Sequence, residues 1–322
     1  MKKWMKAIAA MMVLSMTMTG CGGSGDSADG GKYRVGIVQQ LEHPALDAAS
    51  LGFQEKLIEL TDGNVAFDYQ NAQGEQTNCT TIATKFVSDG VDLIMANATT
   101  ALQSAAAATA DIPIVGTSVT DYVTAGVVDS NEAPGRNVTG ASDLAPIDEQ
   151  IAMLVELVPD VQKVGILYCS AEPNSIYQSK LAQAELDKAG VAWAEYTAAD
   201  SNEVQSVVTK AISECDVLYV PTDNTMANNT EIIRNVAVPA GIPVIAGEEG
   251  ICAGCGVATL SISYYDLGAK AAEMAYEILV NGASPAEMPI AYVSEGITEK
   301  YNAEIAETLN IAIPEGMVAI GE

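Results

Sequence analysis

Several short segments of this sequence place hydroxyl, amide and carboxylate side chains directly after an apolar stretch of four to seven residues. Together such side chains offer a small polar solute several hydrogen-bond donors and acceptors. The candidate ligand-binding residues are Gln40, His43, Thr99, Thr100, Ser118, Thr120, Asp121, Glu172, Asn174, Ser175, Thr222, Asp223, Asn224 and Tyr264. The chemistry expected of them is non-covalent binding, with no catalytic residue and no metal ligand among them.

Two pairs of these residues favour an anion, and one residue favours a cation. Asn174 and Ser175 stand just ahead of an expected helix, where free N–H groups and the positive end of the helix dipole attract a carboxylate. Thr99 and Thr100 hold a similar position at a helix start in the first half of the chain. Asp223 is placed to accept from an ammonium group. The set therefore suits a zwitterion or another small polar solute.

A plainer interpretation stays open for each of these residues. Ser, Thr, Asp and Asn are also the preferred helix N-caps, and every helix needs one. His43, beside Pro44 at a helix start, either faces the ligand and donates to it or is a solvated loop residue. The recurrence of polar residues after several strands favours binding over capping.

The sequence has no motif for bond-making chemistry. It contains no Walker loop, no GxGxxG after a strand, no HExxH and no GxSxG. His43, the only histidine, has no Ser or Cys nucleophile motif near it in sequence. We therefore expect neither an enzyme nor a cofactor.

Cysteine usage also argues against a metal site. Apart from Cys21 there are five cysteines, an odd number that disfavours a full disulfide framework. Cys252 and Cys255 form a lone CxxC with no second pair, whereas structural zinc needs four ligands at defined spacing. A local disulfide and two free thiols both remain open for this pair.

The elements that must position the polar residues alternate between strand and helix. We expect strands at 33–38, 65–69, 92–95, 113–116, 163–168, 191–196, 217–220, 242–246 and 290–293. We expect helices at 44–60, 75–89, 102–110, 147–158, 176–188, 203–215, 226–240, 266–279 and 300–309. The βα series 32–143 and 145–263 each hold enough strands for a parallel sheet covered on both faces. The expected fold is α/β, with two doubly wound parallel-sheet lobes and ligand at the carboxyl ends of the strands.

The N-terminus has the features of an export signal. Lys2, Lys3 and Lys6 precede an apolar run at 7–18 that is too short to span a bilayer, and small residues then lead to Cys21. We expect a signal peptide at 1–20, lipidation of Cys21 and a flexible Gly/Ser/Asp tether at 21–31. An ordinary secretory signal with an unrelated cysteine is the alternative. The mature protein would then be extracytoplasmic and held at the membrane by lipid.

The charge of the chain excludes two classes of partner. The formal net charge is −27, and the three lysines are the only charged residues in 1–20, so the mature chain would carry −30. A body this acidic repels nucleic acid and anionic headgroups. The residues after the tether suffice for two lobes of ordinary size.

Six stretches, in order along the chain, resemble the substrate-binding lipoproteins of bacterial ABC importers of the tryptophan/tyrosine-binding type. They are GIVQQLEHPALDAASLGFQEKL, DIPIVGTSVTDYVTAGVV, GRNVTGASDLAP, EPNS, YVPTDN and YYDLGAKAAEMAYEIL. The resemblance implies the type I periplasmic-binding-protein fold with a three-segment hinge. It places 32–144 and 265–288 in lobe 1, and 145–264 and 289–322 in lobe 2. Tyr122 departs from the family pattern, which commonly has Pro there, and the CxxC is not a family feature that we recognise.

The resemblance also implies a function. A monomer would capture an aromatic or apolar amino acid and deliver it to a membrane permease with its ATPase. Tyr122, Tyr264 and Tyr265 would flank an aromatic ligand side chain, although buried tyrosine is more often core. A sugar or nucleoside receptor of the same fold and a ligand-sensing partner of a membrane receptor are the alternatives.

Overall fold

Strands and helices alternate through residues 32–293 and 297–321, the part of the chain that the structure, a computed structural model, describes. The first half contains β1 (Tyr33–Gln39), α1 (Pro44–Leu60), β2 (Val65–Asn71), α2 (Gln76–Asp89), β3 (Leu93–Asn97), α3 (Thr99–Ala108), β4 (Ile114–Val119), β5 (Val138–Ser142), α4 (Ile147–Leu157) and β6 (Lys163–Cys169). The second contains α5 (Pro173–Ala189), β7 (Ala192–Ala198), α6 (Val204–Ile212), β8 (Val217–Val220), α7 (Asn224–Ala227), α8 (Thr230–Ala237), β9 (Val244–Ala246), α9 (Glu249–Cys255), β10 (Ala258–Ser261), α10 (Tyr264–Leu279), a 3₁₀ turn (Pro285–Glu287), β11 (Ala291–Tyr292), β12 (Thr298–Tyr301), α11 (Ala303–Leu309) and β13 (Val318–Ala319).

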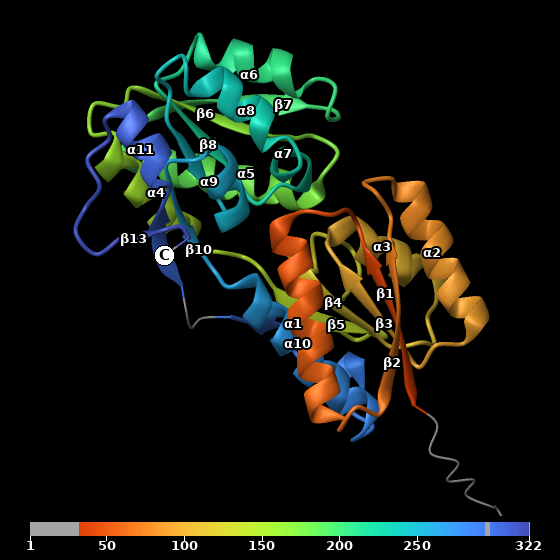
Figure 1. Ribbon diagram of the computed structural model, residues 1–322. Helices are drawn as coiled ribbons and strands as arrows, with labels where there is room; N and C mark the ends of the chain where they lie inside the picture. The colour runs from red at the N-terminus through yellow and green to blue at the C-terminus, as the bar shows by residue number, and fades with distance from the viewer. Residues whose placement is uncertain (1–31, 294–296, 322) are drawn as a thin grey trace, which may run out of the picture. The chain divides into compact units, whose positions relative to one another are not determined.

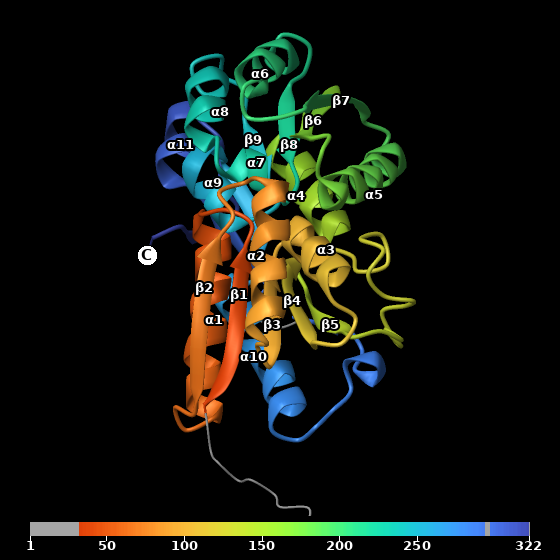
Figure 2. The same ribbon diagram turned by 90° about the vertical axis from the view of Figure 1, so that its right-hand side faces the viewer.

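The first sheet has the strand order β11-β5-β4-β3-β1-β2, and all its pairs are parallel. Alternate strand residues point to opposite faces. Val35 and Ile37 therefore pack with α1 and α10, whereas Val38 packs with α2 and α3. The two helix pairs lie on opposite sides of the strands (Figure 1), and α2 and α3 lie in front of them in Figure 2.

The second sheet has the strand order β13-β12-β10-β9-β8-β6-β7. Only the β10–β12 pair is antiparallel among the pairs of the described strands. Residues of α4, α5 and α11 cover one face and residues of α6, α8 and α9 the other. Both sheets are thus buried on both sides, as the near-continuous apolar strands predict.

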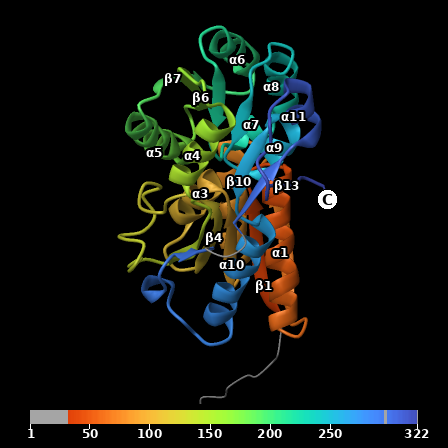
Figure 3. The same ribbon diagram turned by 90° about the vertical axis from the view of Figure 1, so that its left-hand side faces the viewer.

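The chain crosses between the two sheets three times. The crossings lie between β5 and α4, between β10 and α10, and between β11 and β12; Figure 3 shows the chain entering α10 from β10. The expected α/β fold with two parallel-sheet lobes is confirmed. Because β11 pairs with β5, residues 291–292 lie in the first sheet, although the sequence analysis placed them in lobe 2.

The helices α5 and α3 each start three residues earlier than expected. α5 begins at Pro173, whose fixed φ and missing N–H suit a first helical position, and α3 begins at Thr99. Asn174, Ser175 and Thr100 therefore lie within the first helical turn and not ahead of the helix. α5 ends as expected at Gly190, which adopts the left-handed conformation (φ 71°).

Some expected elements were wrong or incomplete. Lys300 and Tyr301 form β12, and α11 starts only after Asn302, whose side chain accepts from the Ile305 N–H. The expected helix 226–240 is two helices, α7 and α8, separated at Asn228 and Asn229. The short strands β5, β10 and β13 and the helix α9 were not expected.

The expected signal peptide, Cys21 and tether lie outside the described residues. No described helix combines the length and the apolar character needed to cross a membrane.

Candidate functional site

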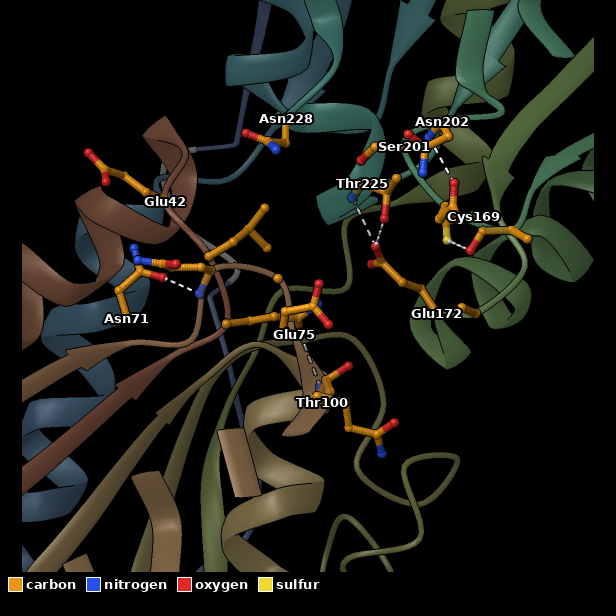
Figure 4. A pocket seen from close by; sticks show the side chains of 18 residues that line it. Glu42, Asn71, Glu75, Thr100, Cys169, Glu172, Ser201, Asn202, Thr225 and Asn228 are labelled. Carbon is orange, nitrogen blue, oxygen red and sulfur yellow. Dashed lines mark hydrogen bonds between the residues drawn. The ribbon is translucent and has the colours of Figure 1, made fainter. Parts of the chain in front are cut away.

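The carboxyl ends of the strands in both sheets face an outer cleft of about 590 Å³. Gln40 and Thr100 line it from the first sheet and Glu172 from the second. Figure 4 shows residues of the two sheets on opposite sides of this cleft: Glu42, Asn71, Glu75 and Thr100 on one, and Cys169, Glu172, Thr225 and Asn228 on the other. The Gln40 Oε1 accepts from the Thr100 N–H at 3.3 Å. A cleft therefore lies where the sequence predicts the site, at the carboxyl ends of the parallel strands.

Half of the expected site residues line a second, smaller cavity, which we call the inner cavity. It is lined by His43, Leu46, Ser118, Asp143, Asn174, Thr222, Asp223, Asn224, Ala227, Glu248 and Tyr264. Its volume is only about 10 Å³, roughly the space of one water molecule. A larger solute can enter only if the walls move apart.

Four expected site residues line neither cavity. Ser175 is fully buried, and Thr99 is nearly so. Asp121 accepts from the Thr124 N–H at 2.6 Å and from Asn131 at 3.2 Å, and thus stabilises its own loop. Thr120 is buried and donates to Asp143 Oδ1 at 2.9 Å, so it positions a wall residue of the inner cavity.

Three buried polar atoms near the site have no hydrogen-bond partner among the described residues: His43 Nδ1, Thr99 Oγ1 and Ser118 Oγ. A buried polar group without a partner costs about 1–3 kcal/mol. Ser118 also has a left-handed backbone (φ 56°), as does Ala98 just before α3 (φ 88°). Such strain concentrates at ligand sites, and of the three residues His43 and Ser118 line the inner cavity.

Two hydrogen bonds join residues of the two lobes. His43 Nε2 lies 3.2 Å from Asn224 Oδ1. Gln178 on α5 donates to Thr120 Oγ1 of the first lobe at 3.1 Å, and within its own lobe it donates to the Thr222 carbonyl at 3.1 Å. These bonds place the two strand edges in direct contact around the inner cavity.

Glu172 accepts hydrogen bonds from several residues on the second-sheet side of the cleft. Its Oε1 accepts from the N–H and hydroxyl of Thr225, at 2.9 and 2.8 Å. Its Oε2 accepts from the backbone and side-chain N–H of Asn224, at 3.0 and 2.7 Å, and from Asn174 at 3.2 Å. The start of α7 is thereby tied to the start of α5.

Three further carboxyl groups are buried around the inner cavity. Burial raises the pKa of Asp143 to about 6, against the hydrogen bonds from Thr120 and Tyr264 that oppose the rise. Burial raises the pKa of Glu248 to about 7. Burial, followed by repulsion from Glu172, raises the pKa of Asp223 to about 7. Ion pairing among the described residues involves none of these groups.

Asp143 and Glu248 were not among the site residues predicted from the sequence. Glu248 comes two residues after the end of β9, a predicted strand, so the rule that polar residues after strands form the site would have found it. Asp143 directly follows β5, a strand that was not predicted, so the same rule could not reach it.

Of the three tyrosines expected to flank a ligand, only Tyr264 lines the inner cavity. Tyr122 is fully buried in the core of the first sheet and donates to the Ala141 carbonyl at 3.0 Å. Tyr265 is 39% exposed and donates to Glu55. Tyr122 thus fills the space against Gly116 and does not contact the site.

The cysteine pair is part of the core. Cys252 and Cys255 are buried free thiols on α9, packed between β9 and α8. Burial raises the pKa of both thiols far above the usual range, which makes them inert. Within residues 32–293 and 297–321, no group of three or more His, Cys, Asp or Glu side chains is arranged to hold a metal ion.

A comparison with known protein families identifies the family of this chain. Residues 34–321 match the family described as ABC transporter substrate binding protein. The chain belongs to this family. It is a substrate-binding protein of the periplasmic-binding-protein type, built from two parallel-sheet lobes.

Three relatives of this substrate-binding protein are informative. A tyrosine-binding protein of Clostridioides difficile is 39% identical over 300 residues, which cover 89% of this chain and 86% of that protein. An ABC domain from Streptococcus pneumonia, solved in complex with L-Trp, is 32% identical with a TM-score of 0.86 and covers 90% of this chain and 100% of its own. A ligand-free, open substrate-binding protein from Clostridium difficile is 38% identical with a TM-score of 0.70, covering 89% and 99% of the two chains.

Proposed function

We propose that this substrate-binding protein captures an aromatic amino acid between its two lobes and delivers it to a membrane permease. The observation that carries the proposal is the pair of buried, unpartnered polar atoms, His43 Nδ1 and Ser118 Oγ, on residues that line the inner cavity. Relatives at 39% and 32% identity that bind tyrosine and tryptophan support the ligand class.

Capture requires hinge motion. The inner cavity has room for about one water molecule, so an amino acid must separate the walls before they close around it. The crossings between β5 and α4 and between β10 and α10 are the segments that would bend, and contacts with both lobes would favour the closed form. We place the lobes at 32–144 with 265–293 and at 145–264 with 297–321.

The ligand class is tested by thermal unfolding of the purified protein with a panel of L-amino acids and sugars. A ligand present at one hundred times its Kd adds about 2.7 kcal/mol to the free energy of unfolding. We expect L-tyrosine, L-tryptophan or L-phenylalanine to raise the Tm by about 5 °C or more. A shift with a sugar and with no amino acid would overturn the proposal in favour of a sugar receptor.

We further propose that Cys21 carries the lipid that holds the protein at the outer face of the membrane. The basic, apolar and small-residue segments ahead of Cys21 support this proposal. Substrate-binding proteins of ABC importers are extracytoplasmic, which agrees with an export signal. Fractionation of cells that produce Cys21→Ser should move the protein from the membrane to the medium or the soluble fraction; membrane retention would contradict the lipid anchor.

A further inference from the structure

A fully buried glutamine lies where the β5–α4 crossing enters the second lobe. Gln150 is in the first turn of α4, and none of its surface is exposed. It shares the buried side of the helix with Ile147, Ile151 and Leu154, which are apolar. A polar side chain at such a position is the informative exception in a protein core.

The amide of Gln150 bonds to three other segments of the second lobe. Its Nε2 donates to the Leu260 carbonyl at 2.8 Å and to the Gly247 carbonyl at 3.2 Å. Its Oε1 accepts from the Tyr219 hydroxyl at 2.6 Å. Because carbonyl oxygens can only accept, the amide nitrogen must face them, and the orientation of the side chain is fixed. Gln150 therefore joins α4 to β8, to the end of β9 and to β10.

The Gly247 end of this network supports the wall of the inner cavity. Gly247 directly precedes Glu248, a wall residue, and its N–H donates to the Val220 carbonyl at 2.7 Å. A Cβ on Gly247 would lie 2.6 Å from the backbone nitrogen of Thr222, which is also a wall residue. By holding Gly247, Gln150 fixes two wall segments although it does not line the inner cavity itself.

The Leu260 end of the network connects the two crossings. Leu260 lies near the end of β10, and the β10–α10 crossing then leads to Tyr264 at the start of α10. The Tyr264 hydroxyl donates to Asp143 Oδ2 at 3.0 Å, and Asp143 begins the β5–α4 crossing. The two crossings are thus bonded to each other at both ends, through Tyr264 and Asp143 at one end and through Leu260 and Gln150 at the other.

We infer that Gln150 is a positioning residue for ligand binding, which makes the two crossings bend together and holds the Thr222 and Glu248 wall in place. If the crossings bent separately, Leu260 would move away from α4, and buried carbonyl groups would lose their donor. Bending that keeps the network intact is therefore favoured, and it moves the wall segments as one unit when the lobes close. This inference rests on the proposed capture by hinge motion.

Hydrogen–deuterium exchange of the ligand-free protein, read by mass spectrometry, tests the coupling in Gln150→Met. This variant keeps the side-chain length and removes the three hydrogen bonds. We expect amide exchange to rise about tenfold or more in 143–147, 247–251 and 260–264 together, because local opening follows the loss of local contacts. Exchange in β6 and β7 of the same lobe should stay unchanged. A general loss of stability would instead raise exchange across the whole second sheet.

Isothermal titration calorimetry with L-tyrosine and L-tryptophan, at a temperature well below the Tm, tests the effect on binding. We expect Gln150→Met to weaken the affinity about tenfold, because binding must then order wall segments that the wild-type protein holds in place beforehand. A loss of global stability alone does not change the affinity of the folded protein.

Two control variants separate positioning from stability. Tyr219→Phe removes one hydrogen bond of Gln150 but leaves those to Gly247 and Leu260. Val208→Ala truncates a buried side chain of α6, on the other face of the second sheet. Both should lower the Tm, yet leave exchange in the crossings unchanged and the affinity within about twofold of wild type, because neither removes a contact to the crossings or the wall. If Gln150→Met does not fold, the double variant Gln150→Met/Tyr219→Phe, in which no tyrosine hydroxyl is left unpartnered, takes its place.

The outcomes distinguish this inference from the proposed function. Faster exchange in only one crossing, faster exchange throughout the second sheet, or an unchanged affinity in Gln150→Met overturns the positioning role alone. If the wild-type protein binds neither amino acid, the proposed function is overturned, and the exchange pattern of the ligand-free protein still decides whether Gln150 couples the crossings.

Discussion

Ser118 and Thr259 each bury a hydroxyl without a hydrogen-bond partner, but only Ser118 lines the inner cavity. Removing a buried, unsatisfied hydroxyl leaves stability unchanged or slightly higher. Ser118→Ala should therefore keep the Tm of the ligand-free protein and weaken ligand binding about tenfold, as measured by calorimetry. Thr259→Val, which removes the matched hydroxyl on β10, should leave the affinity unchanged. Equal losses in both variants would argue against a ligand contact at Ser118.

The buried acids also make stability depend on pH. Because the pKa of Glu248 is raised to about 7 in the folded state, the folded protein binds more protons than the unfolded chain between about pH 4.5 and 7. The free energy of unfolding of the ligand-free protein should therefore fall as pH rises through this window. Glu248→Gln should flatten this dependence in urea unfolding measured at pH 5, 6, 7 and 8. An equally steep dependence in the variant would show that other groups cause it.

At the scale of elements, α1 and α10 approach each other so closely that only glycine fits at the contact. A Cβ on Gly268 would lie 1.9 Å from the Ala49 carbonyl oxygen, and one on Gly52 would lie 2.1 Å from the Tyr265 carbonyl oxygen. The helix pair connects the first sheet to the β10–α10 crossing. The backbone of these two helices thus sets where Tyr264 enters the inner cavity.

Gly268→Ala should push α10 away from α1 and lower the free energy of unfolding by about 2 kcal/mol or more. Chemical denaturation measures this loss. Lys270→Ala, on the exposed side of the same helix, removes only a surface ion pair to Glu273 and should cost less than about 0.5 kcal/mol. If Gly268→Ala left the free energy of unfolding unchanged, α1 and α10 would be able to move apart without loss of stability.

The elements that could be predicted from sequence are those with regularly spaced apolar residues or with a residue type that marks the beginning or end of a helix. α1 begins at Pro44, and α2 and α5 end at left-handed Gly90 and Gly190. The short strands β5 and β10 have only five and four residues, too few for a pattern of period two to stand out. Because β5 was not predicted, Asp143 was not recognised as a residue that follows a strand. The candidate site was therefore predicted only in part.

The roles of the site residues could not be predicted from residue types alone. Asp223 is an N-cap whose side chain accepts from the Met226 and Cys169 N–H groups, although its type also suits an ammonium group. Glu248 likewise caps α9 through the N–H groups of Gly250 and Ile251, and both acids also line the inner cavity. Residue type therefore does not separate capping from ligand binding, because both use the same side chains.

At the scale of the whole molecule, two lobes meet through hydrogen bonds between strand edges. Gln178, on α5, donates to Thr120 of the other lobe. This contact exists only when the strand edges are together, and it should slow the escape of a bound ligand.

Gln178→Met keeps the side-chain length and removes the hydrogen bond to Thr120, together with the two bonds to Thr222 within the second lobe. We expect the dissociation rate of the bound amino acid to rise about tenfold in stopped-flow fluorescence. Gln183→Met, one turn further along α5, bonds only to Ser179 and Glu195 within the second lobe and is the control. Unchanged dissociation in Gln178→Met would mean that the contact does not hold the lobes together.

Equilibrium dialysis of the purified protein against radiolabelled L-tyrosine and L-tryptophan tests the central claim most directly. We expect one labelled molecule to be retained per chain and to be displaced by the unlabelled amino acid but not by a sugar. Retention of neither amino acid, together with saturable binding of a sugar, would contradict the account.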